Sequence, residues 1–264
     1  MKQIARAAFA VIMITWLTAV RASTNSSEIT DMWWNPAESG WGVNVILQND
    51  VAFLTFFVYD TSQTPIWYTS AVQYQGANGA GALVWTGNLY ATRGPWFGGA
   101  FPPANVVVRQ AGTATFTVSN LNQATLTYSV DGVPVTKALQ RQTWTMENYS
   151  GNYAGGYSIR LTGCNPAYLN GVQEVAGIVT VNQNGASISM SAASSIGSCS
   201  FSGTYAQTGK LGQAQGSYSC SDGTIGTFSL VEMTPTISGF TARASGQNQY
   251  CQWTGYFGGI TRAQ

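Results

Sequence analysis

The amino-acid sequence predicts an all-β protein made of two small antiparallel up-and-down β-barrels in tandem, with two β-sandwiches as the alternative. Three observations support this expectation. Short runs rich in β-branched and aromatic residues recur along the chain, while the periodicity of amphipathic helices is hard to find. Turn-forming pairs such as Asn-Gly and Asp-Gly separate several of these runs. The two halves also share an outline, because each opens on a Ser-Gly pair close to an aromatic residue and ends near an arginine.

The first 22 residues have the features of a secretory signal peptide. Lys2 and Arg6 precede an apolar run over residues 7–20, which is too short to span a bilayer comfortably. Small residues suited to cleavage lie before Ser23, and an uncleaved N-terminal anchor is the alternative. No later segment has the composition of a transmembrane helix. We therefore expect a periplasmic, cell-surface or secreted protein without a transmembrane segment after signal cleavage, with residues 23–31 as an N-terminal extension.

Residues 32–146 are expected to form a tryptophan-rich β domain. Asn49-Asp50 and Asp131-Gly132 suit tight hairpins, residues 60–65 suit a longer turn, and the Gly- and Pro-rich residues 94–103 suit a wide loop. The strands expected between these turns cover residues 42–47, 51–59, 66–74, 82–90, 106–108, 113–118, 124–130 and 133–144.

Residues 147–264 are expected to form a second β domain, with a boundary near residues 145–149 and no obvious flexible linker. Asn184-Gly185 and Asp222-Gly223 are strong hairpin signals. The strands expected over residues 212–218 and 224–230 are rich in Gly, Ser and Thr, which predicts a shallow or closely packed interior. We therefore expect this half to be chiefly structural.

All four cysteines lie in the second half, and their even number in an exported chain predicts two disulfides. A hairpin folded at Gly209-Lys210 places Cys199 opposite Cys220, and this register predicts a cross-strand disulfide. Cys164 is then left to pair with Cys251, which would close the seam of a barrel. The competing scheme joins Cys164 to Cys199 and Cys220 to Cys251.

The charge balance argues against a nucleic-acid partner. Removing Lys2, Arg6 and Arg21 with the signal peptide leaves eight of the 11 basic residues against 10 acidic ones, a formal charge of −2. No basic stripe is present that could follow a phosphate backbone. The absence of histidine and of any Cys-x-x-Cys spacing argues against a zinc site, and no phosphate loop or dinucleotide motif indicates a cofactor.

Catalytic chemistry has few candidate residues, and we expect no enzyme activity and assign no catalytic residue. Without histidine the chain has no Ser-His-Asp triad and no Cys-His dyad. Glu38 and Asp60 are the one carboxylate pair in an aromatic-rich setting, so a carboxylate-dependent hydrolase is an alternative. The structural interpretation is stronger, in which Glu38 caps the backbone amides of a turn and Asp60 opens a hairpin.

The segment Trp34-Asn35-Pro36-Ala37-Glu38-Ser39-Gly40-Trp41-Gly42, with Phe57-Val58-Tyr59-Asp60 and Pro65-Ile66-Trp67-Tyr68, carries a specific resemblance. It resembles a functionally uncharacterised module that recurs in exported proteins of Gram-negative bacteria. The resemblance covers residues 32–144. It implies export and assigns no catalytic residue.

A second resemblance is to calycins, the lipocalin and avidin type of up-and-down barrel, which open on a Gly-x-aromatic strand and pack a late Arg across the aromatic ring. Gly40-Trp41 with Arg141, and Gly151-Asn152-Tyr153 with Arg262, are similar to that arrangement. The resemblance implies that Arg141 stacks on Trp41 or Trp34 by a cation–π contact. It also implies a carrier of an apolar small molecule, with a deep cavity in the first domain.

Aromatic residues are the best candidates for binding. Because neighbouring residues on a strand point to opposite faces, some of the many aromatic side chains of the first half must face outward. Residues 92–103 form a loop with Arg93, Trp96 and Phe97, and long loops on rigid barrels often carry function. Seven of the eight tryptophans after the signal peptide lie in this half: Trp33, Trp34, Trp41, Trp67, Trp85, Trp96 and Trp144.

These observations favour an exported, non-catalytic binding or cell-surface module. The preferred ligand is a carbohydrate or another neutral hydroxylated molecule, bound by exposed aromatic side chains. The alternatives are a structural or adhesion protein that contacts a protein partner at the cell surface, the apolar carrier and the hydrolase. The candidate ligand-binding residues are Trp33, Trp34, Trp67, Arg93, Trp96 and Phe97.

Overall fold

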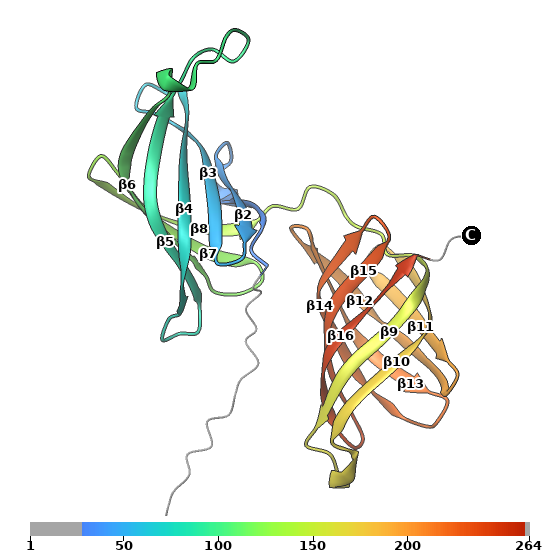
Figure 1. Cartoon of the computed structure of the whole chain (residues 1–264). Helices are drawn as coiled ribbons and strands as arrows, with labels where there is room; N and C mark the ends of the chain where they lie inside the picture. The colour runs from blue at the N-terminus through green and yellow to red at the C-terminus, as the bar shows by residue number, and fades with distance from the viewer. Residues whose placement is uncertain (1–27, 262–264) are drawn as a thin grey trace, which may run out of the picture.

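The computed structural model describes residues 28–261, which form two closed eight-stranded antiparallel barrels (Figure 1). Within each barrel every strand pairs with its neighbours in sequence, and the last strand pairs with the first. The predicted fold class is thereby confirmed, and the sandwich alternative is wrong. The expected signal peptide, residues 1–22, and Arg262 lie outside the described residues. Among residues 28–261 no helix is long and apolar enough to cross a membrane.

The first barrel contains strands β1 to β8 and two short 3₁₀ helices. The strand β1 pairs with β8 through Trp33 and Trp34, which closes the barrel. The strand β6 begins on the far side of the wide loop and runs through Gly112, so it joins two segments expected as separate strands. The strands are β1 (Asp31–Trp34), β2 (Gly42–Gln48), β3 (Val51–Tyr59), β4 (Pro65–Ala77), β5 (Leu83–Arg93), β6 (Val107–Val118), β7 (Gln123–Val130) and β8 (Val133–Arg141), with η1 (Pro36–Glu38) and η2 (Pro103–Asn105).

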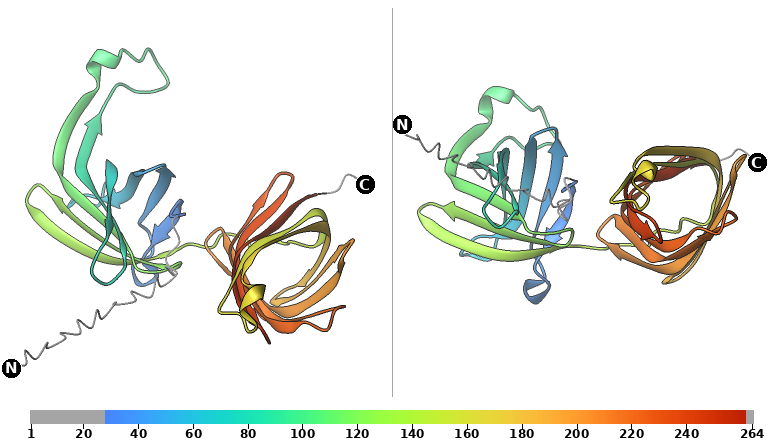
Figure 2. Two further views of the ribbon diagram at one scale, coloured as in Figure 1. Left: turned by 60° about the horizontal axis from the view of Figure 1, so that its bottom comes forward. Right: turned by 90° about the horizontal axis from the view of Figure 1, so that it is seen from below.

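The second barrel contains strands β9 to β16 and one 3₁₀ helix. Figure 2 shows the two barrels side by side, joined by residues 142–150. The strands are β9 (Gly151–Thr162), β10 (Gly171–Asn184), β11 (Ser187–Ser194), β12 (Gly197–Thr208), β13 (Leu211–Cys220), β14 (Ile225–Thr236), β15 (Gly239–Asn248) and β16 (Gln252–Thr261), with η3 (Ala167–Leu169) after β9.

Alternation of buried and exposed residues along each strand builds the core of the first barrel. On β3, Leu54 and Phe56 point inward while Phe53 and Phe57 are exposed, as a period of two requires. Trp33 is fully buried and meets Phe116 edge to face, with ring centroids 5.3 Å apart. Aromatic and aliphatic side chains therefore fill this interior.

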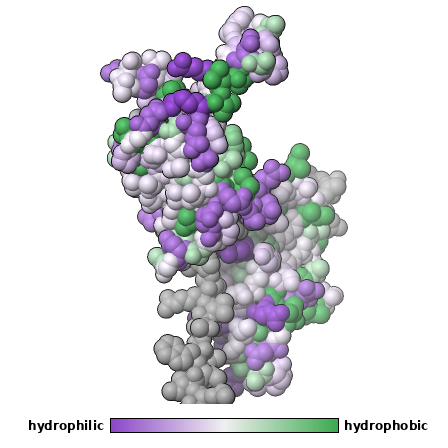
Figure 3. Space-filling model, turned by 60° about the vertical axis from the view of Figure 1, so that its left-hand side comes forward, coloured by the Kyte–Doolittle hydropathy of each residue, from purple (hydrophilic) through white to green (hydrophobic). Residues whose placement is uncertain are grey.

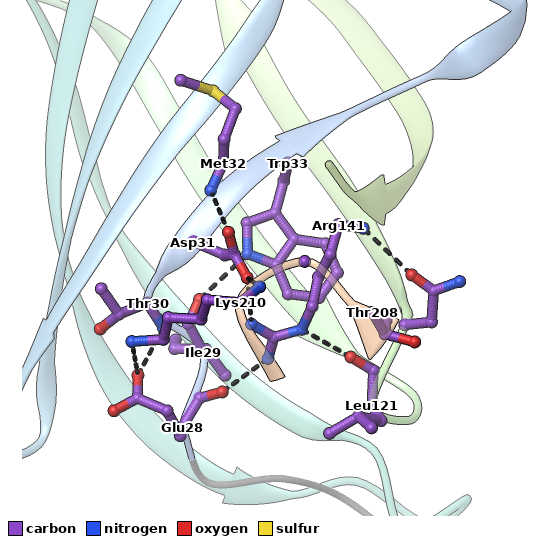
Figure 4. Close-up of polar contacts among 12 residues, drawn as sticks. Glu28, Ile29, Thr30, Asp31, Met32, Trp33, Leu121, Arg141, Thr208 and Lys210 are labelled. Carbon is purple, nitrogen blue, oxygen red and sulfur yellow. Dashed lines mark hydrogen bonds and ion pairs between the residues drawn. The ribbon is translucent and has the colours of Figure 1, made fainter. Parts of the chain in front are cut away.

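A buried arginine closes one end of the first barrel, where the start of β1 lies beside the β6–β7 turn. The Arg141 guanidinium lies over the Trp33 ring, 4.6 Å from its centroid, and pairs with Asp31 at 3.1 Å (Figure 4). It also donates to the carbonyl oxygens of Leu121 at 2.6 Å and Glu28 at 2.5 Å. The resemblance to calycins implied stacking on Trp41 or Trp34, and this is wrong, because Trp33 is the inward-facing residue opposite Arg141 in the β1–β8 pair.

The tip of the β12–β13 hairpin of the second barrel docks on this buried pair. The Lys210 backbone N–H donates to Asp31 Oδ2 at 3.0 Å, and the Gly209 N–H donates to Thr143 Oγ1 at 2.9 Å (Figure 4). Gln207 donates to the Thr145 carbonyl at 2.7 Å. Because each bond joins the hairpin to β1 or to the segment after β8, the two barrels pack directly against each other.

Candidate ligand-binding cavity

Tyrosine side chains close the end of the second barrel that faces the first. Tyr149 is 1% exposed, and its hydroxyl donates to the Met233 carbonyl at 2.8 Å. The Tyr153 hydroxyl donates to the Tyr149 carbonyl at 2.8 Å, and Phe240 packs edge to face on both rings. Burial raises the pKa of Tyr149 far above its ordinary value. We call Tyr149, Tyr153 and Tyr205 the tyrosine plug.

A cavity of about 420 Å³ lies beyond the plug, inside the second barrel. All eight strands contribute to its wall. Phe201 lies at the centre of a ring cluster, stacked on Tyr218 at 5.4 Å and meeting Phe228 edge to face at 5.4 Å. The Tyr218 ring in turn meets Trp253 at 6.2 Å. The interior is therefore a roomy aromatic chamber, and the expectation of a shallow or closely packed interior is wrong.

Glycines account for much of this room. Gly155, Gly156 and Gly177 line the cavity, and a Cβ at any of them would overlap the backbone of a neighbouring strand. These positions leave the wall without side chains where the strands curve most closely past one another. Since the number of strands sets the barrel radius, small residues leave the interior empty and do not draw the walls together. This is the physical reason for the failed expectation.

The mouth of the cavity lies at the opposite end from the plug, among the turns that follow β9, β11, β13 and β15. Both disulfides are located there. Cys199 pairs with Cys220 across β12 and β13, and Cys164 pairs with Cys251, which is the connectivity expected from the hairpin at Gly209. Three of the four cysteines line the cavity, so the disulfides hold the rim of the mouth in place.

The electrostatic character of the cavity is simple. Among the described residues that line it, Asp222 is the one with an ionisable charge at neutral pH. The Thr224 backbone N–H donates to Asp222 Oδ1 at 2.9 Å, and this bond holds the pKa of Asp222 below its ordinary value. Burial raises the pKa of Tyr157 on the cavity wall, and the nearby Tyr218 and Asp222 add to that shift. The remaining wall is neutral.

The residues proposed from the sequence as ligand-binding lie in different parts of the first barrel and do not form one surface. Trp33 belongs to the core and offers no surface, which corrects its assignment as a ligand-binding residue. Trp34 is half-buried on β1. The β5–β6 loop holds Trp96 and Phe97 outward, 74% and 88% exposed, with Arg93 exposed at the end of β5. Figure 3 shows hydrophobic residues gathered beside the base of this protruding loop.

Trp67 lies on a separate aromatic surface of the first barrel. It is exposed on the outer face of β4, directly opposite exposed Phe57 on β3. Both rings line a shallow groove of about 330 Å³, together with Gly40, Val58, Tyr59, Pro65 and Ile66. No ring contact among residues 28–261 joins Trp67 to Trp96, although both lie towards the same end of the barrel.

The two carboxylates proposed for a hydrolase are both engaged in local structure. Glu38 accepts a hydrogen bond from Trp41 Nε1 at 3.0 Å and pairs with Lys137 at 2.7 Å, which lowers the pKa of Glu38. The Glu38 carboxylate binds the side chains of Trp41 and Lys137 and, among residues 28–261, no backbone amide, so its expected role as a cap of backbone amides is wrong. Asp60 accepts from the N–H groups of residues 62 and 64 in the β3–β4 turn. No metal-binding group of three or more ligands occurs among residues 28–261.

No protein-family model and no curated protein matches the chain. Among solved structures, the chain is similar to the isotype 1 transferrin binding protein B from serogroup B Neisseria meningitidis. The identity is 11%, the alignment covers 88% of this chain and 69% of that chain, and the TM-score is 0.25. A likeness at this score carries no argument about function, so the function must be argued from the site itself.

Proposed function

We propose that this protein is an exported binding module whose second barrel holds an apolar small molecule. The cavity of about 420 Å³ carries the proposal. Its size falls within the range of small-molecule sites, and its aromatic wall would bury most of such a ligand. The plug closes one end, and the disulfide rim keeps the other end in shape.

The energetics favour an apolar occupant. A ligand that buries on the order of 250 Å² of apolar surface gains about 6 kcal/mol before the costs of association are subtracted. Polar ligands would lose hydrogen bonds to water, because the wall beyond the mouth is formed mainly by rings and aliphatic side chains. The two disulfides favour an oxidising compartment, which supports export.

Binding of a fluorescent probe tests this proposal. The neutral fluorophore N-phenyl-1-naphthylamine should brighten on entering the cavity of the full chain. Ala192→Phe fills part of the cavity and should abolish most of the signal, since Ala192 lines the wall. Ala176→Phe is the matched control, because Ala176 is exposed and outside the lining. Equal probe binding by the folded Ala192→Phe variant and the wild type would overturn the proposal.

A second candidate function is recognition of a carbohydrate or another neutral hydroxylated molecule by the first barrel. The exposed Phe57 and Trp67 pair beside the groove supports it, since flat aromatic faces stack on sugar rings. A glycan array with the wild type and Trp67→Ala tests it. A sugar bound by the wild type and lost by the variant supports this function, and no response on the array counts against it.

A protein partner at the cell surface would also be contacted through exposed aromatic side chains. Trp96 and Phe97 are among the most exposed large apolar side chains. In this alternative, the β5–β6 loop that carries them contacts the partner protein. Concentration-dependent assembly in light scattering, lost in Trp96→Ala, would support contact between copies. If Trp96→Ala still binds a glycan, then glycan binding by the Phe57 and Trp67 pair does not depend on the β5–β6 loop.

A further inference from the structure

Resting on the proposed apolar site, we infer that the preferred ligand of the second barrel is an amphiphile with an ammonium head. Its apolar body fills the aromatic cavity, and its ammonium head lies at the mouth beside Asp222. A carboxylate head is disfavoured at the same place.

Positive side chains are absent from the described wall of the cavity. The lining residues include Asp222 and no lysine or arginine. Arg160 on β9 is exposed on the outer face, opposite Val172 of β10. Lys210 lies at the docked hairpin tip, and Arg243 is held by Glu232 at 2.6 Å. A carboxylate entering the mouth would therefore lose water without gaining a cationic partner.

The negative side chain, in contrast, is well placed to receive a cation. Asp222 is in the β13–β14 turn, two residues after Cys220 and within the lining of the mouth. Hydrogen bonds from Thr224 orient the carboxylate and favour its charged form. Its exposure lets the head group keep part of its hydration, so the cost of burying a charge is avoided.

Aromatic rings next to the mouth add a second attraction. Tyr157 and Tyr218 both line the cavity. Tyr157 lies within the electrostatic influence of Asp222, and Tyr218 contacts the Trp253 ring. Ring faces attract ammonium groups, whereas they repel carboxylates. Both effects have the same sign, so the order of affinity should be cation, then neutral molecule, then anion.

Three competitors that share a ten-carbon chain and differ in the charge of the head group test this order of affinity. Decyltrimethylammonium, decanol and decanoate are each used to displace N-phenyl-1-naphthylamine from the full chain at neutral pH and low salt, below their aggregation concentrations. We expect decyltrimethylammonium to bind about two- to fivefold more tightly than decanol, the range of a single exposed charge interaction. Decanoate should bind more weakly than decanol, and added salt should narrow the differences.

Variants assign the effect to the mouth. Asp222→Asn should remove most of the preference for the cation and leave decanol unchanged. Glu174→Gln is the control, because Glu174 accepts from Ser158 on the outer face and does not line the cavity. Equal affinities for the three competitors, or an unchanged order in Asp222→Asn, would overturn the inference while the apolar site stands. Failure of all three to displace the probe would overturn both.

Discussion

Replacing Gly209 by alanine should separate the two barrels. Gly209 has a φ of +61° at the tip of the β12–β13 hairpin. A Cβ there would overlap Asp31 Oδ2 and lie 2.9 Å from Arg141 Cβ. Asp31 and Arg141 are buried and bonded to each other, so neither can move aside cheaply. The hairpin tip must therefore withdraw.

The expected loss of docking free energy follows from the hydrogen bonds that the tip of the β12–β13 hairpin makes with the first barrel and the segment after it. The bond from Lys210 N–H to the Asp31 carboxylate involves a charged acceptor and contributes about 2 kcal/mol, and the bond from Gly209 to Thr143 contributes about 1 kcal/mol. The left-handed backbone costs alanine about 1 kcal/mol more. The docking free energy should fall by about 3 kcal/mol, and the stability of the second barrel by about 1 kcal/mol.

Gly185→Ala supplies a matched control. Gly185 occupies the β10–β11 turn with a φ of +58°, and a Cβ there meets nothing within 4 Å. It should suffer the same backbone strain, a loss of about 1 kcal/mol or roughly 5 °C in the melting temperature of that barrel, without undocking.

Small-angle X-ray scattering and thermal unfolding together distinguish the two variants. Gly209→Ala should increase the radius of gyration, and Gly185→Ala should not. Scattering curves that are identical for the two variants would refute the argument that the tip is a docking contact between the barrels.

Three further predictions concern stability. Arg141→Met should destabilise the first barrel by about 3–5 kcal/mol in urea denaturation, because it leaves a buried carboxylate without its cationic partner. Arg109→Met, at an exposed and solvent-screened ion pair, should cost far less, and similar losses in the two variants would contradict this. Burial raises the pKa of Tyr205 to about 12, so between about pH 10 and pH 12 this residue should add about 1.4 kcal/mol per pH unit to the fall in the free energy of unfolding, because its unfolded form alone loses the proton. Tyr205→Phe should reduce the total slope by that amount and leave the contributions of the other buried tyrosines, and an unchanged slope would disprove the assignment. Replacing Cys164 and Cys251 by serine should cost about 4–5 kcal/mol, from the 87-residue separation, and a loss below about 1 kcal/mol in calorimetry would count against it.

The strands and hairpins were largely predictable because their signals are local. Asp131-Gly132 and Asn184-Gly185 form the expected turns, with positive φ at Asp131, Gly132 and Gly185. The register of the β12–β13 hairpin followed from its turn, and with it the position of Cys199 opposite Cys220. The short strand β1 was missed, because its four residues carry no alternation long enough to identify.

The candidate site was mostly not predictable. Aromatic residues were expected to make the first barrel the binding domain, yet Trp33 and Trp85 are buried in its core. The Gly-, Ser- and Thr-rich strands over residues 212–218 and 224–230 predict a shallow or closely packed interior, whereas Gly155 and Gly177, on other strands, leave space in the wall. Alternation of glycine with Tyr153 and Tyr157 was the signal that could have indicated a hollow interior.

The sequence by itself determined the all-β class, the hairpins and the disulfide pairing, because each depends on a period of two residues or on turn chemistry over a few residues. Only the tertiary structure decided that Trp33 and not Trp34 meets Arg141, since a whole barrel must close before inside and outside are defined. It also decided where the cavity lies. The empty volume is what remains of the space enclosed by a closed barrel after the inward-facing side chains of all its strands have filled their share.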